Sequence, residues 1–123
     1  MKTGVELIVA ERTRQIEKEG WSAEHDDEHG REELAQAAAV YAAPCQIFEM
    51  CGDGGRTLVL TDIWPFDDEW DKRTHKYTGA YDIYRDEWLK KNKARRIKEL
   101  TKAGALIAAE IDRIQRLTED PTQ

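Results

Sequence analysis

A short polar segment, residues 20–30, breaks the helical periodicity and is predicted to be a loop. It concentrates the side chains that could do chemistry. Its sequence, GWSAEHDDEHG, places His25, Asp26, Asp27 and His29 within five positions. Imidazole and carboxylate groups bind metal ions, and they also transfer protons as general acids or bases. Aspartates cap helix starts as well, so a structural use, in which they order the next helix, is the main alternative.

Aromatic side chains suggest what such a segment would bind. The four tryptophans are Trp21, Trp64, Trp70 and Trp88. In loops, tryptophans either anchor small cores or stack on planar ligands. A pocket roofed by Trp21 and Trp64, with Arg14 or Lys102 near a phosphate and an aspartate at a ribose, would suit a nucleotide. The predicted ligand-binding residues are therefore Arg14, Trp21, His25, Asp26, Asp27, His29, Trp64 and Lys102.

Two families of metal-dependent phosphohydrolases offer an alternative. Those of the MazG type hold Mg²⁺ with Glu-x-x-Glu on one helix and Glu-x-x-Asp on another. Glu32 and Glu33, and later Glu110 and Asp112, have neither spacing. Those of the HD type need a His-Asp doublet and distant ligands. His25–Asp26 provides the doublet, but His75, the remaining histidine, lies in a region without pattern. Mg²⁺ is therefore the one candidate cofactor, and the sequence favours ligand binding over catalysis.

The first element that must position these residues is a helix at residues 3–19. Thr3 and Glu6 have the spacing of a capping box, which satisfies two backbone amides at a helix start. Gly20 can take the left-handed conformation that ends helices. Apolar residues at helical spacing predict the face that packs inward: Val5, Ile8, Val9 and Ile16.

Two further helices are predicted at residues 31–43 and 93–117. Apolar residues of the last one recur at alternating intervals of three and four, as in a coiled-coil seam: Ile97, Leu100, Gly104, Ile107, Ile111 and Ile114. We expect this seam to pack on the other two helices, with Gly104 at the closest approach. Because the apolar content is modest, a homo-oligomer, most simply a homodimer, would complete the core.

The middle of the chain, residues 51–92, lacks a sustained period and is predicted to be an irregular insertion, in part β. Residues 56–61 (RTLVLT) have the composition of a short strand that still needs a partner, and residues 82–92 have that of a short helix. The prediction is a mainly all-α fold, in which residues 1–123 form a single domain, a small bundle of three main helices.

Charge and hydropathy narrow the classes of partner. The formal net charge is −6, with 19 basic and 25 acidic side chains, which makes nucleic-acid binding unlikely. The basic cluster between Lys90 and Lys102 is typical of a solvated helix face. Since no apolar run reaches 18 residues, we expect no membrane span and a cytoplasmic protein.

Four linked sequence blocks point to a family. They are ERTRQIEKEGWSAEHDDEH (11–29), ELAQAAAVYA (33–42), WPFD (64–67) and KAGALIAAEIDRI (102–114). Together they resemble a family of small proteins encoded by bacteriophages and prophages. The resemblance covers about half the chain, and it implies origin and fold more than activity. After Trp70 the chain departs from the family, which has Trp-Lys-Pro near this point.

The helix that ends in Gly20–Trp21 and the Asp26–Asp27 pair are also similar to ryanodine-receptor repeat domains, which are associated with adenine-nucleotide ligands. The Trp and Asp/His side chains of residues 20–30, together with the phage resemblance, lead to one hypothesis: a phage accessory protein in a bacterial host cell that binds a small nucleotide-like ligand and sequesters a host defence signal. The alternatives are a metal-dependent nucleotide phosphohydrolase and a module that binds or inhibits a host protein.

Overall fold

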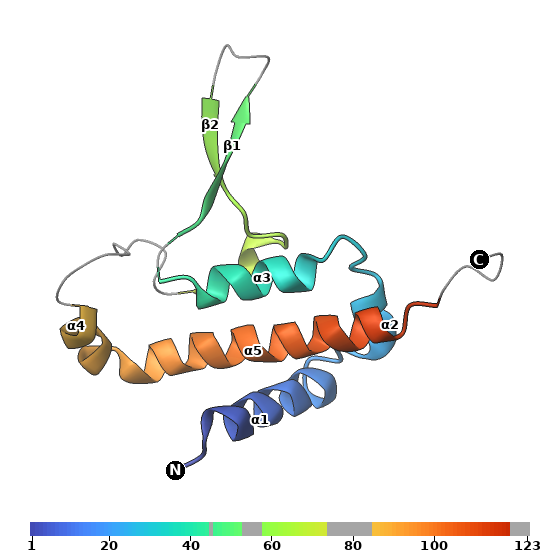
Figure 1. Ribbon diagram of the computed structural model, residues 1–123, viewed down its shortest axis with the longest axis horizontal. Coiled ribbons are helices and arrows are strands. Elements are labelled where there is room, and N and C mark those ends of the chain that lie inside the picture. The colour runs from blue at the N-terminus through green and yellow to red at the C-terminus, as the bar shows by residue number, and fades with distance from the viewer. Residues whose placement is uncertain (45, 53–57, 74–84, 119–123) are drawn as a thin grey trace.

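The chain folds into a mainly helical structure, as predicted (Figure 1). The computed structural model describes residues 1–44, 46–52, 58–73 and 85–118. Its elements are α1 (Gly4–Glu17), α2 (Ala23–Asp27), α3 (Glu33–Ala42), β1 (Phe48–Gly52), β2 (Leu58–Asp62), the 3-10 turn η1 (Asp68–Trp70), α4 (Arg85–Lys91) and α5 (Lys93–Gln115). Much of the predicted insertion, residues 53–57 and 74–84, lies outside the described residues.

Helix α5 is the centre of the fold, with α3 running antiparallel along one side and α1 lying along the other (Figure 1). The α3–α5 contact is built largely from small residues, which let the two helices approach closely. Its buried cluster consists of Leu34, Ala37, Ala38, Tyr41, Ala103, Leu106 and Ala109. Arg96 completes this contact, because its guanidinium donates to the carbonyl oxygens of Tyr41 (2.8 Å) and Ala42 at the end of α3.

The predicted start and stop signals of the first helix are confirmed. The Glu6 amide donates to Thr3 Oγ1 (3.3 Å), and the Thr3 amide donates to Glu6 Oε1 (3.2 Å). Gly20 has a φ of +72°, the left-handed conformation expected after a helix end. The helix itself ends a little earlier than predicted, at Glu17.

The predicted inward faces of α1 and α5 are wrong. Five seam residues of α5 are 41–51% exposed, namely Ile97, Leu100, Ile107, Ile111 and Ile114, and three apolar residues of α1 are also exposed, namely Val5, Val9 and Ile16. The buried face of α5 instead mixes small apolar residues with paired charges, among them Glu110 and Arg113, whose Oε1 and Nε lie 2.5 Å apart. Hydrophobic periodicity alone cannot identify a contact face of this kind.

Gly104 is the one seam position whose predicted role is confirmed. A Cβ placed on Gly104 would lie 2.5 Å from Ile8 Cδ1 and 2.7 Å from Ile8 Cγ1, so α1 packs directly on the glycine. A side chain at this point would force Ile8 to move.

This contact gives a testable coupling between the two positions. Gly104→Ala alone is expected to leave the free energy of unfolding unchanged or lower it by about 1–2 kcal/mol, since the clash offsets the better helix propensity of alanine. In an Ile8→Ala background, the same substitution should raise stability by about 1 kcal/mol. Urea unfolding of the four proteins measures the coupling, and additive effects would contradict the contact.

Two local predictions need correction. The segment 20–30 was expected to be a loop, but residues 23–27 form α2, whose start is capped by Ser22 accepting from the His25 amide (3.3 Å). Asp26 and Asp27 do not cap the start of α3. The residue before that helix is Glu32, which has a φ of +60° and makes no side-chain cap. The predicted strand is confirmed at Leu58–Asp62, and its partner is Phe48–Gly52 in an antiparallel hairpin.

Candidate functional site: an aromatic cleft

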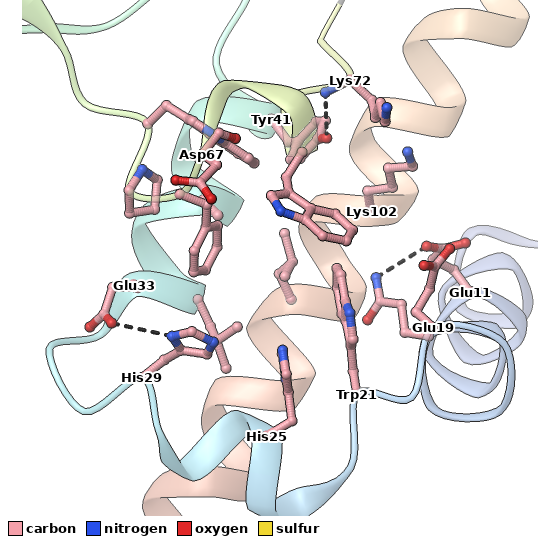
Figure 2. A pocket seen from close by; sticks show the side chains of 18 of the residues that line it. Glu11, Glu19, Trp21, His25, His29, Glu33, Tyr41, Asp67, Lys72 and Lys102 are labelled. Carbon is pink, nitrogen blue, oxygen red and sulfur yellow. Dashed lines mark hydrogen bonds and ion pairs between the residues drawn. The ribbon is translucent and has the colours of Figure 1, made fainter.

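A cleft of about 1150 Å³ opens on one side of the helical layer (Figure 2). Residues from α1, α2, α3 and α5 line it, together with the segment that follows β2. The volume slightly exceeds the roughly 300–1,000 Å³ that is typical of small-molecule sites. Six of the eight predicted ligand-binding residues line the cleft: Arg14, Trp21, His25, His29, Trp64 and Lys102.

Aromatic rings follow one another around the wall. The Trp21 and His25 rings are stacked at 5.6 Å with planes only 5° apart, and each later pair meets edge to face at 5.0–5.6 Å. The order of the rings is Trp21, His25, His29, Phe66, Trp64 and Tyr41. A wall of this kind offers flat, polarisable surfaces to a planar ligand.

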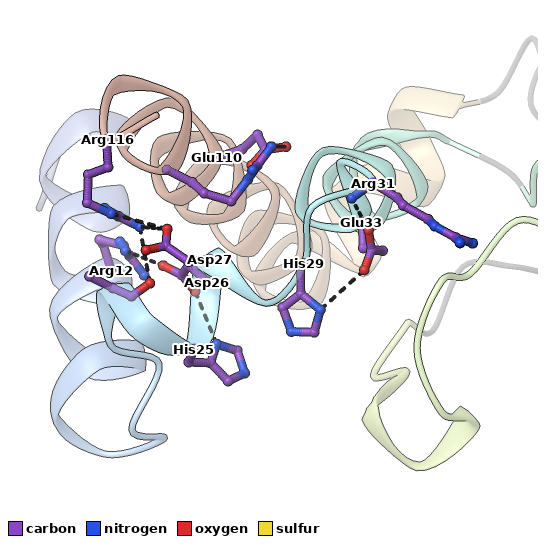
Figure 3. A network of polar contacts seen from close by, with 11 residues as sticks. Arg12, His25, Asp26, Asp27, His29, Arg31, Glu33, Glu110 and Arg116 are labelled. Atoms are coloured by element: carbon purple, nitrogen blue, oxygen red, sulfur yellow. Dashed lines mark hydrogen bonds and ion pairs between the residues drawn. The ribbon is translucent and has the colours of Figure 1, made fainter. Parts of the chain in front are cut away.

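Both histidines contact a carboxylate through Nδ1 (Figure 3). His25 Nδ1 lies 3.1 Å from Asp26 Oδ1, and His29 Nδ1 lies 3.3 Å from Glu33 Oε2. Burial opposes the charge on Glu33, but hydrogen bonds from the Arg31 and Glu33 amides and from His29 outweigh it and lower its pKa. Because each Nδ1 is engaged, Nε2 is the ring nitrogen left for a ligand, and the His25 ring points into the cleft (Figure 2).

The two predicted aspartates do not line the cleft. Asp26 is completely buried, and its Oδ2 accepts from Arg12 Nη2 at 2.8 Å. Asp27 faces the other way and accepts from Arg116 Nη2 at 2.8 Å (Figure 3). Both therefore tie α2 to its neighbours, α1 and the end of α5, and their predicted contact with a ribose has no support in this geometry.

Lys102 is a partly buried cation of the cleft that is available to an anionic ligand. Its Nζ lies 5.7 Å from the centre of the Tyr41 ring, and no carboxylate of the described residues comes within 4 Å of it. Burial lowers the pKa of Lys102, and the nearby positive charge of Lys98 lowers it further. The negative charge of a bound anion would stabilise the protonated lysine and so oppose both effects.

Arg14, the other predicted phosphate ligand, is already occupied. Its guanidinium donates to both carboxylate oxygens of Glu11, at 2.8 and 2.9 Å, and to Glu19 Oε1 at 2.6 Å. These bonds raise the pKa of Arg14 and compensate its charge. Arg14 and Lys102 were equivalent phosphate ligands in the sequence prediction, and the geometry favours Lys102.

The segment after β2 is held firmly against the cleft. Arg73 is buried and pairs with Asp71 (2.7 Å) and Asp62 (3.0 Å), while its guanidinium carbon lies 5.6 Å from the centre of the Trp64 ring. Trp64 donates its indole N–H to the Asp67 carbonyl oxygen at 3.0 Å. The indole of Trp64 is therefore positioned before any ligand arrives.

Several lining residues were not among the predicted ligand-binding residues, including Tyr41 of α3 and, in the segment after β2, Phe66 and Lys72. The Lys72 amide donates to Tyr41 Oη at 3.1 Å (Figure 2). Burial raises the pKa of Tyr41, so the phenol stays neutral and its hydrogen is free to donate.

Comparisons with protein-family models, with curated proteins and with solved structures found no match. Among the described residues, no three histidine, cysteine, aspartate or glutamate side chains converge as a metal ion would require. Nor does any helix in the part of the chain that the structure describes have the length and apolar character of a membrane span.

Proposed function

We propose that this protein binds a small nucleotide-like molecule in the aromatic cleft. The observation that carries the proposal is the combination of a ring-lined wall with one partly buried lysine that has no carboxylate partner among the described residues. Stacking on indole or imidazole is open to any nucleobase, since every base has a flat π face. A phosphate fits Lys102, because a charge-assisted bond to it forms in surroundings already partly free of water.

The resemblance to phage proteins suggests the biological use. Binding alone is enough to remove a nucleotide from solution, so we propose that the protein sequesters a nucleotide signal of the host's defence. The structure gives the metal-dependent alternative no supporting cluster among the residues described, and Glu110, one of its proposed carboxylates, is engaged with Arg113.

The test is calorimetric titration with a panel of mononucleotides, dinucleotides and cyclic nucleotides, and with the matching nucleosides. We expect at least one nucleotide to bind and its nucleoside to bind more weakly. Lys102→Met should lower nucleotide affinity about tenfold, the usual worth of a hydrogen bond to a charged group, and should leave nucleoside affinity unchanged. No binding across the panel would overturn the proposal.

Lys93→Met is the matched control, because Lys93 lies on the same helix, is exposed, does not line the cleft and does not contribute to the pKa shift of Lys102. The affinity of the wild-type protein should also fall as the pH rises through the lowered pKa of Lys102. Above that pKa the lysine must take up a proton to bind an anion. Equal pH profiles for the wild-type protein and Lys102→Met would show that the ligand's charge is recognised elsewhere.

A further inference from the structure

One surface of the helices carries large apolar side chains that remain exposed. We call it the α1–α5 face. Its members are 46–72% exposed: Val5, Val9 and Ile16 of α1, and Leu100, Ile107, Ile111 and Ile114 of α5. The sequence pattern predicted that these residues are buried, but in the single chain they are exposed.

The face lies opposite the aromatic cleft. Successive residues of an α-helix are about 100° apart, so Ile107 and Ile111 lie roughly 140–180° around α5 from Lys102, which lines the cleft. On α1, Ile16 lies roughly 160° from Arg14, another lining residue. Contact at this face would therefore leave the cleft open.

The apolar residues buried inside the chain are unusually small. Five of the nine buried hydrophobic residues are alanines, and only Leu34, Val40, Tyr41 and Leu106 are larger. More large apolar side chains are thus exposed than buried among the described residues. Since burial of apolar surface is the main force that stabilises a fold, this chain gains most by covering the α1–α5 face.

We infer that a second copy of this chain covers the α1–α5 face and forms a two-fold symmetric dimer. Leu100, Ile107, Ile111 and Ile114 follow one another at intervals of seven, four and three, the spacing of a heptad stripe that packs against an identical stripe. These four positions are themselves uncharged, so pairing them with the same four positions of a second copy brings apolar side chains together. A two-fold interface uses the same surface on both copies and needs no other partner.

The area of the face agrees with such a dimer. A whole aliphatic side chain has on the order of 100 Å² of apolar surface, so seven half-exposed ones leave roughly 350–400 Å². A specific interface buries about 800 Å² per partner, of which roughly 60% is apolar. The α1–α5 face supplies most of that apolar part, and the two clefts of the dimer would point outward, each open to its own ligand.

Sedimentation equilibrium of the full chain at micromolar concentration tests the dimer. The wild-type protein should have twice the 14.2 kDa chain mass, and its melting temperature should rise with protein concentration. Replacing both Ile107→Glu and Ile111→Glu should weaken association tenfold or more, because dimerisation would then bury charges. Met50→Glu is the matched control, since Met50 is 66% exposed but lies on the projecting hairpin.

Two results would overturn the inference. One is a single-chain mass for the wild-type protein over the whole concentration range, with a constant melting temperature. The other is a double glutamate variant that keeps its helical circular dichroism and the wild-type mass. Should that variant unfold, replacing both Ile107→Ala and Ile111→Ala provides the same test without charge, and it too should shift the equilibrium toward single chains.

Discussion

Trp21→Ala is expected to lower the affinity for the best-binding nucleotide of the panel by roughly 10- to 100-fold. Stacking of a base on an aromatic side chain is worth about 1–3 kcal/mol. The Trp21 indole lies parallel to the His25 ring, so its loss also removes the support that holds this imidazole in place. Calorimetry measures the affinity, and circular dichroism verifies that the variant keeps its helices.

Two further variants separate stacking from general damage. Trp21→Phe keeps a flat ring and should recover part of the affinity. Trp88→Ala removes an indole from α4, which does not line the cleft, and should leave binding unchanged. If Trp21→Ala binds as tightly as the wild-type protein, Trp21 serves only to cover the core residues that it contacts.

The local signals of the sequence were sufficient for the helices but not for their packing. The capping box at Thr3 and the left-handed Gly20 depend on neighbours within a few residues, and both were predictable. The exposed seam was not, because a heptad pattern records that apolar residues share a side of the helix and not what covers that side. The same heptad pattern is expected whether the apolar residues pack in the core of one chain or against a second chain.

The candidate site was predictable by residue type and less so by role. Trp21, Trp64 and the two histidines line the cleft because the short helix α2 and the turn after β2 lie next to each other there. The roles of the adjacent aspartates depend on rotation: one residue step turns a helix by about 100°, which puts Asp26 inside and Asp27 outside. Arg14 and Lys102 could be distinguished only once Glu11 and Glu19 were located in space.

Asp26→Ala is expected to destabilise the fold by about 3–5 kcal/mol, a large part of the stability of a domain this size. Asp26 is fully buried and accepts from Arg12 Nη2, and the side chain of Arg12 is itself only 14% exposed. Nε and Nη1 of Arg12 have no hydrogen-bond partner among the described residues, so removing Asp26 leaves a largely buried guanidinium without its carboxylate. Urea unfolding monitored by circular dichroism measures the loss.

The neighbouring Asp27 provides the matched control, because its pair with Arg116 is open to water, with side chains 50% and 34% exposed. Asp27→Ala should therefore cost less than about 1 kcal/mol. Joining Asp26→Leu to Arg12→Met, which removes both charges at once, should restore much of the stability that Asp26→Ala loses. Equal losses in the Asp26 and Asp27 variants would mean that the buried pair does not hold α2 to α1, and the position of His25 in the cleft would then need another cause.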